Sequence, residues 1–177
     1  MRTSIIFSLT AAATVATAFN FATDAIDGIY MMGPNDTEPY LIKEINHTLL
    51  PPATPSSTTP DSASLTQRDT LPISSYNCES NTILDGVNYQ QAEAELKSLC
   101  ATQKIGAASG LVATVGSAQV FGCSWGYSNP CSEDEINQAM SYLDSNCGSN
   151  LTPGKVYMKS WKKDYGRELS GDWPCPN

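Results

Sequence analysis

The stretches LVATVGSAQVFGCSW, residues 111–125, and PCSEDEINQAMSYLDSNCG, residues 130–148, decide the fold of this 177-residue chain. The first is rich in Val, Thr, Ala and Phe, with Gly116 and Ser117 in its middle. That pattern predicts two strands joined by a tight turn.

The second stretch carries the start and stop signals of a helix. Ser132 and Glu135 have the spacing of a capping box, and acidic residues 133–135 suit the positive end of the helix dipole. Gly148 supplies a left-handed stop. The expected apolar stripe between these signals consists of Ile136, Ala139, Met140, Leu143 and Cys147.

Working outward, the pattern predicts a second amphipathic helix over residues 88–100, with an apolar face that ends at Cys100. Residues 155–161 alternate as in a half-buried strand, and a further short strand is expected near Tyr76. These elements predict a small disulfide-stapled α+β sandwich, with two helices packed on one face of an antiparallel sheet.

All six cysteines lie within residues 69–177, which we expect to form one cysteine-rich α+β domain. An even count in a small secreted domain predicts three disulfides, and six cysteines allow fifteen connectivities. Both predicted helices end in an inward cysteine, which favours a bridge between them. The favoured pairing is a helix-to-helix Cys100–Cys147 bridge, a local Cys123–Cys131 clasp, and Cys78–Cys175 tying the ends of the domain.

Residues 1–18 have the features of a secretory signal peptide. Arg2 gives a positive start, an apolar run follows, and Ala16-Thr17-Ala18 is a small-residue cleavage site with the cut expected after Ala18. The alternative is a membrane anchor, but a spanning helix needs about 20 apolar residues and this run is shorter. We therefore expect a secreted, extracellular, monomeric protein without stable membrane insertion.

Residues 19–68 are expected to be a disordered, Pro/Ser/Thr-rich pro-region. Eleven of the fourteen residues 51–64 are Pro, Ser or Thr, a composition that buries too little apolar surface to offset the entropy of ordering. A cut after Arg68 is expected to release the segment, and the alternative is a retained disordered arm. Four apolar residues at near-helical spacing are expected to cover an apolar patch of the domain before cleavage: Ile42, Ile45, Leu49 and Leu50.

Three Asn-x-Thr acceptors for glycosylation occur in the chain. Asn35 and Asn46 lie in the expected pro-region, and Asn150 follows the stop signal of the second helix.

The charge balance and the histidine count exclude several functions. The chain carries 10 basic and 18 acidic residues, a net charge of −8, which argues against nucleic-acid binding. The sole histidine, His47, lies in the expected pro-region, so the domain has no Ser-His-Asp arrangement and no histidine metal ligand. We therefore expect no catalytic residues, no metal and no cofactor.

The enzymatic alternative left by this inventory is a small secreted glycoside hydrolase that uses a pair of carboxylates. Asp164 and Glu168 are expected to be solvated, and no spacing selects two acids as a pair. The candidates are Glu133, Glu135, Asp164, Glu168 and Asp172.

Basic and aromatic residues are interleaved in one short strip of this acidic chain. Such a strip is a candidate site for a host protein or an extracellular glycan, since aromatic faces beside cations engage sugars, anions and proteins. The alternative is that lysine stems cover an exposed sheet face while Trp161 and Tyr165 pack into the core. This basic-aromatic strip consists of Lys155, Tyr157, Lys159, Trp161, Lys162, Lys163, Tyr165 and Arg167.

One sequence layout resembles a known class. GCSWGYSNPCS at residues 122–132, an acidic helix to Cys147-Gly148, Trp161 and the triplet 165–167 resemble the small secreted cysteine-rich, effector-like proteins of filamentous fungi. The resemblance implies a non-enzymatic virulence protein that binds a host or extracellular component during colonisation. The layout is also similar to virally encoded fungal killer toxins of α/β-sandwich type, which implies as an alternative an antimicrobial toxin released by pro-segment cleavage.

Overall fold

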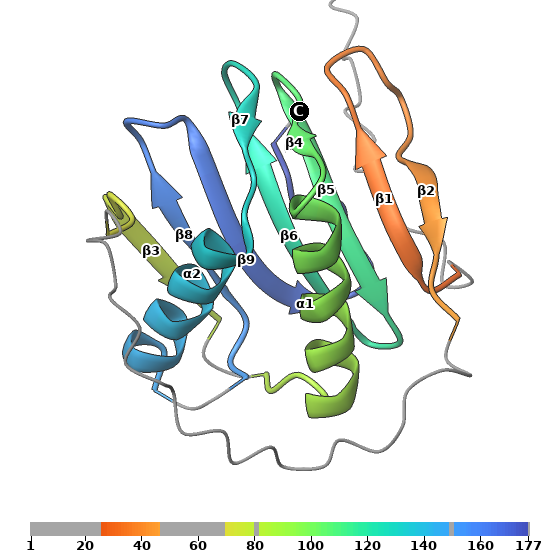
Figure 1. Ribbon diagram of the computed structural model, residues 1–177. Coiled ribbons are helices and arrows are strands. Elements are labelled where there is room, and N and C mark those ends of the chain that lie inside the picture. The colour runs from red at the N-terminus through yellow and green to blue at the C-terminus, as the bar shows by residue number, and fades with distance from the viewer. Residues whose placement is uncertain (1–25, 47–69, 80–81, 149–150, 177) are drawn as a thin grey trace, which may run out of the picture.

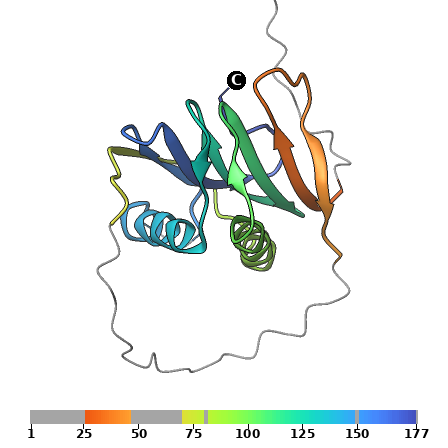
Figure 2. The same ribbon diagram turned by 45° about the horizontal axis from the view of Figure 1, so that its top comes forward.

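The computed structural model describes residues 26–46, 70–79, 82–148 and 151–176. They form two layers, a seven-stranded antiparallel sheet and two helices that lie on the same face of it (Figures 1 and 2). The α+β class and the placement of both helices on one face are as predicted. The sheet is larger than predicted, because it contains three strands that the sequence pattern did not reveal.

The strand order across the sheet is β2-β1-β5-β6-β9-β8-β3. α1 packs over β5 and β6, and α2 packs over β8 and β9. The helices are α1, Gly86–Cys100, and α2, Glu133–Asn146. The strands of the sheet are β1 (Gly28–Met32), β2 (Tyr40–Glu44), β3 (Ser75–Cys78), β5 (Ser109–Val115), β6 (Ala118–Ser124), β8 (Gly154–Met158) and β9 (Lys163–Leu169); β4 (Lys104–Ile105) and β7 (Asn129–Pro130) form a separate small sheet.

The central hairpin of β5 and β6 confirms the strand pair predicted for residues 111–125. Seven residue pairs align between Ser109 and Ser124 at one end and Val115 and Ala118 at the other. Gly116 turns the chain at φ +51°, a conformation that favours glycine. Every residue of both strands is buried, so this hairpin forms the centre of the fold.

At the start of α2, one of the two hydrogen bonds of the predicted capping box forms. The Ser132 hydroxyl accepts the backbone N–H of Glu135, as expected of an N-cap. The Glu135 carboxylate does not return to the cap, because it binds Lys163 and Tyr165 on β9 instead. Gly148 follows the helix at φ +88°, which confirms the left-handed stop.

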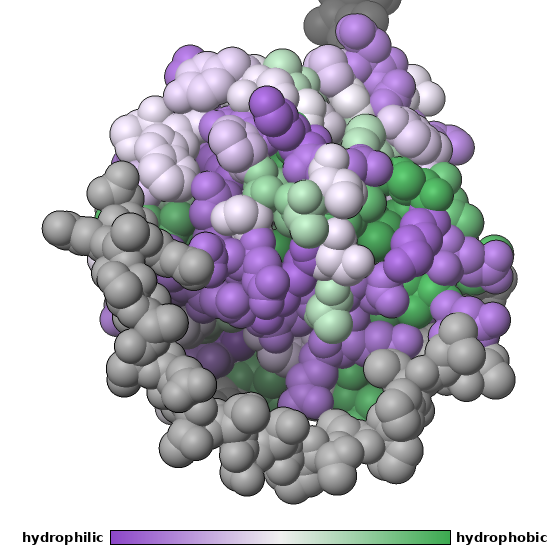
Figure 3. All heavy atoms as spheres, viewed as in Figure 1, coloured by the Kyte–Doolittle hydropathy of each residue, from purple (hydrophilic) through white to green (hydrophobic). Residues whose placement is uncertain are grey.

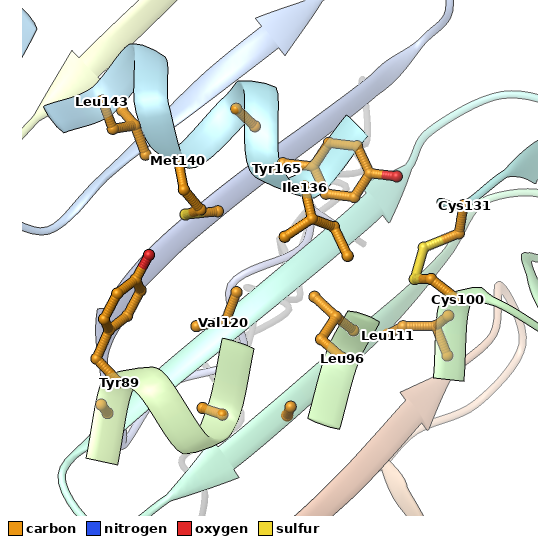
Figure 4. Packing of buried hydrophobic residues seen from close by; sticks show 14 of the residues in the cluster. Tyr89, Leu96, Cys100, Leu111, Val120, Cys131, Ile136, Met140, Leu143 and Tyr165 are labelled. Atoms are coloured by element: carbon orange, nitrogen blue, oxygen red, sulfur yellow. A yellow bond between two sulfur atoms is a disulfide. The ribbon is translucent and has the colours of Figure 1, made fainter. Parts of the chain in front are cut away.

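The main core lies between the helices and the sheet. Figure 4 shows Leu96 of α1 and Ile136 and Met140 of α2 directed into the space over Val120 of β6. Leu96, Ile136 and Val120 are fully buried. The apolar stripes predicted for both helices therefore face the sheet.

The strand predicted for residues 155–161 ends earlier, at Met158. The backbone N–H of Trp161 bonds to the Met158 carbonyl and that of Lys162 to the Lys159 carbonyl, which forms a tight turn. Lys162 has φ +50° in this turn. The prediction treated one strand and its turn as continuous and missed β9, which returns beside β8.

Three disulfides form, as predicted, but the favoured pairing is wrong at all three positions. The bridges are Cys78–Cys147, Cys100–Cys131 and Cys123–Cys175. Each helix does end in an inward cysteine, but the helices lie over different strands. Cys147, at the end of α2, therefore meets Cys78 of β3. Cys100, at the end of α1, meets Cys131, the residue before the N-cap of α2.

The expectation of disorder across residues 19–68 is wrong for β1 and β2. β1 aligns with β5 over five residue pairs, so it extends the main sheet. Ile45 is buried and Ile42 packs against the core, but they do so from an extended segment and not from a helix. Leu49 and Leu50 lie outside the described residues, as do the signal peptide, the Arg68 cleavage position and Asn150. Asn35 and Asn46 are described and exposed.

Within the described ranges, no helix combines the length and apolar character needed to cross a membrane. Figure 3 shows hydrophilic side chains over the outward surfaces of both helices, with hydrophobic side chains visible beside α1, over β1.

A candidate binding cleft on the outer face of the sheet

The structure divides the basic-aromatic strip between the two faces of the sheet. Lys163, Tyr165 and Arg167 alternate along β9 with side chains on the helix-covered face, and all three are fully buried. Lys155 and Tyr157 on β8 are half-buried on the opposite, outer face. The strip is therefore not one continuous surface.

The buried Lys163 is balanced by an acid from α2. Its ammonium donates to the Glu135 carboxylate and to the Pro130 carbonyl, and the Tyr165 hydroxyl donates to the same carboxylate at 2.7 Å. Burial lowers the pKa of Lys163, and the Glu135 carboxylate opposes that shift. Burial, with Glu135 nearby, also raises the pKa of Tyr165. These groups join α2 to the sheet and are not available to a ligand.

Arg167 is held in the same way beside α1 and α2. Its guanidinium pairs with Asp144 at 2.7 Å and donates to the Thr152 carbonyl at 2.9 Å. It also lies over the Tyr89 ring at 5.2 Å from the centroid. The Arg167 side chain thus packs between the helices and the sheet. Tyr165 does so too, as the alternative interpretation of the strip expected.

The rest of the strip lies in the turn after β8. Lys159 and Lys162 are exposed, and Trp161 is half-buried against the main core. The Lys162 side chain lies over Gly126, where an added Cβ would collide with it. The turn places none of these three residues on the outer face with Tyr157.

The C-terminal segment crosses the outer face and is pinned there by Cys123–Cys175. Trp173 packs against a second small core made of Val112, Phe121 and the bridge. Gly110 of β5 lets this segment approach, because a Cβ there would collide with Cys175 and Trp173. The C-terminal segment therefore covers the outer face over β5 and β6, while Lys155 and Tyr157 of β8 remain partly exposed on it.

A cleft of about 560 Å³ lies beside the C-terminal segment on this face. The Trp125 and Tyr157 rings are 6.4 Å apart between centroids and tilted by 54°. The Lys155 ammonium lies 5.9 Å from the Tyr157 centroid. The residues that line this outer cleft are Trp125, Lys155, Tyr157, Asp164, Pro174, Cys175 and Pro176.

Asp164 is the most informative residue of the outer cleft. It is 1% exposed, and its Oδ1 has no hydrogen-bond partner within the described ranges. Burial raises its pKa to about 7, although Lys155 and the backbone N–H groups of Cys123 and Asp164 favour the charged form. A buried polar atom without a partner is uncommon and often marks a place for a water or a ligand. The expectation that Asp164 is solvated is wrong.

A second, partly buried acid, Glu168, lies four residues further along β9. Burial raises its pKa to about 7, and its Oε1 accepts Gln119 Nε2 at 2.7 Å. Four residues of strand separate the two Cα atoms by about 13 Å. Glu168 does not line the outer cleft, so no carboxylate pair forms there.

The other candidate acids are dispersed. Glu133 is exposed at the start of α2, Glu135 pairs with Lys163, and Asp172 is exposed in the C-terminal segment. No three His, Cys, Asp or Glu side chains of the described residues gather as a metal site.

Another hollow, of about 610 Å³, lies between α2 and residues 70–73. Its lining contains no charged side chain and no buried polar atom without a partner. The outer cleft is the better candidate, because it combines two aromatic rings, a cation and an acid.

The sequence pattern indicated Lys155 and Tyr157 as parts of a site but gave no sign that Trp125 and Asp164 lie beside them. The signal available was the alternation of residues 163–167, which places Asp164 on the face opposite Lys163. Trp125 follows β6 directly, and only the pairing of β6 with β9 and β8 brings it to Tyr157. Comparison of the chain with protein-family models, curated proteins and solved structures finds no match in any of the three.

Proposed function

We propose that this chain is a secreted, effector-like, non-enzymatic protein that binds an extracellular glycan of its host, one sugar unit lying in the outer cleft. The observation that carries the proposal is a tilted Trp125–Tyr157 pair beside a buried carboxyl group with an unpartnered oxygen. An apolar surface with a few placed polar groups is the usual character of a small-ligand site.

The chemistry of the cleft suits a sugar ring. A pyranose has an apolar C–H face, which packs against an aromatic face, and hydroxyl groups at its edge, which need hydrogen-bond partners. Trp125 and Tyr157 supply the rings, and Pro174 and Pro176 supply further apolar lining. Asp164 Oδ1 lies below the surface of the cleft and would accept a hydroxyl group that enters far enough to reach it, and burial makes that hydrogen bond worth more than one in water.

Binding is favoured over glycoside hydrolysis by the arrangement of the acids. Hydrolysis uses two carboxyl groups about 5–9.5 Å apart across the scissile bond. Asp164 lies in the outer cleft, while Glu168 lies outside it and accepts a hydrogen bond from Gln119. The cleft thus offers one acid where the reaction needs two.

Three disulfides support an extracellular location, because such bridges persist in oxidising compartments. A toxin activated by release of a pro-segment is less favoured, since β1 and β2 lie within the main sheet. We therefore place the effector-like function before the toxin.

The proposal is tested by calorimetry of the full chain against soluble oligosaccharides from chitin, β-glucan, xylan and pectin. We expect one class to bind, and Trp125→Ala to weaken that binding at least about tenfold, or about 1.4 kcal/mol. At pH 8, where the Asp164 carboxyl group is mostly ionised, Asp164→Asn is expected to weaken binding because the amide replaces one acceptor by a donor.

Tyr127→Ala is the matched control, since Tyr127 is also an aromatic residue after β6, is 54% exposed and does not line the outer cleft. It should bind as the unchanged chain does. Binding of no oligosaccharide, equal binding by Trp125→Ala, or release of new reducing ends from a bound one would contradict the proposal.

A further inference from the structure

We infer that residues 26–46 are a separable partner of the disulfide-linked remainder of the chain, and that they stay bound after the connection through residues 47–69 is cut. The surface that binds them is the edge of β5 together with the adjoining side of α1. Cleavage after Arg68, if it occurs, would then give a two-chain protein and not a released pro-segment.

The apolar contacts of this segment are those of a core element. β1 aligns with β5 from the Gly28–Thr114 pair to the Met32–Gly110 pair. Ile29 is fully buried, and Ile45 is 5% exposed. Both belong to the main core, together with Leu111 and Leu96 of the remainder.

Polar contacts hold both ends of the same segment. The Asp27 carboxylate accepts the backbone N–H of Gly116 at 2.7 Å, at the turn between β5 and β6. Lys43 on β2 pairs with Glu95 on α1 at 2.6 Å. The segment is thus fixed to the hairpin at one point and to the helix at another.

None of these contacts depends on the connection. The segment contains no cysteine, and the three disulfides join residues between Cys78 and Cys175. On the far side of the connection, Leu71 is 9% exposed and its backbone N–H bonds to Gln138 Oε1 on α2 at 3.0 Å. A cut between Ile45 and Leu71 therefore leaves the described contacts on both sides in place.

Loss of the segment would be unfavourable for the remainder. β5 would become a sheet edge with unpaired backbone groups over buried strand residues. The five aligned pairs and the burial of Ile29 identify residues 26–46 as the occupant that fits this edge.

The inference is tested with the full chain carrying a specific protease site inserted after Arg68. After the cut, we expect both fragments to elute together in native size-exclusion chromatography. In concentrated urea without reductant they should separate, since no disulfide joins them. Loss of the N-terminal fragment in native buffer would overturn the inference.

A second measurement avoids variants that fail to fold. The cut protein is unfolded in urea without reductant, freed of its N-terminal fragment, returned to native buffer with an excess of fluorescent synthetic peptide of residues 26–46, and then chromatographed. We expect the unchanged peptide to be incorporated. The Ile29→Asp peptide should be incorporated at least about tenfold less, because Ile29 is fully buried. The Leu41→Asp peptide should behave as the unchanged one, because Leu41 is 40% exposed. Equal uptake of the Ile29→Asp and unchanged peptides, or no uptake of either, would refute the inference.

Discussion

Asp164→Asn should make the protein more stable above pH 7 while it weakens ligand binding. Burial raises the pKa of Asp164 to about 7, from a usual value of 3.8. Because one unit of pKa corresponds to about 1.4 kcal/mol, ionising this carboxyl group costs the fold up to about 4 kcal/mol. The neutral amide does not have that cost, so we expect a gain of about 2–4 kcal/mol at pH 8.

The sign of the pH dependence follows from the direction of the shift. Between about pH 4 and pH 7 the folded chain keeps the proton of Asp164 while the unfolded chain has lost it. Unfolding then releases a proton, so stability falls as pH rises through this window. Below pH 4 both states hold the proton, and the Asn variant has no advantage.

Glu168 adds a second contribution of the same sign, since burial raises its pKa to about 7 from 4.5. With both acids present, stability should fall by roughly 2–3 kcal/mol per pH unit between pH 5 and pH 6. In Asp164→Asn one acid remains, and the slope should be about half as steep.

The assay is urea unfolding at pH 3, 5, 6 and 8, followed by tryptophan fluorescence with the disulfides intact. Glu133→Gln is the control, because Glu133 is an exposed acid that contributes to the pKa shift of neither Asp164 nor Glu168. It should keep the slope of the unchanged chain. Parallel pH profiles for the unchanged chain and Asp164→Asn would refute the reasoning.

Two further variants test the packing around the sheet. Ile29→Ala should lower the free energy of unfolding in urea by about 2–5 kcal/mol, because it opens a cavity in the main core. Leu41→Ala on the same hairpin should lower it by less than about 1 kcal/mol. Equal small losses for the two variants would mean that β1 is not part of the cooperative fold. Glu135→Ala should cost about 3–5 kcal/mol because it leaves the buried Lys163 ammonium without its carboxylate. The exposed neighbour, Glu133→Ala, should cost at most about 1 kcal/mol through the helix dipole, and similar losses for both variants would contradict the assigned role of Glu135.

The local elements of this protein were predictable because their signals lie within a few residues of each other. The turn at Gly116, the N-cap at Ser132 and the stop at Gly148 each act through the backbone beside them. Hydrophobic periodicity likewise identified the inward faces of both helices. The sequence alone therefore determined the α+β class and the central hairpin followed by a helix.

The strands of the N-terminal hairpin were missed for a physical reason. β2 is mostly exposed, and the composition of the residues after it is that of a disordered region. Burial of Ile29 and Ile45 depends on contacts in the main core with α1 and β5, which lie about 40 residues or more away in sequence. A local pattern carries no information about such a partner.

The disulfide pairing and the functional face were also decided by tertiary structure. Cys147 meets Cys78 because β3 pairs with β8, beneath α2, and Trp125 meets Tyr157 because β6, β9 and β8 are neighbours. The strip that looked continuous in sequence divides because side chains alternate across a strand. Sequence determined which elements form, while long-range strand pairing determined which side chains share a surface, since strand order is set by packing of the whole sheet.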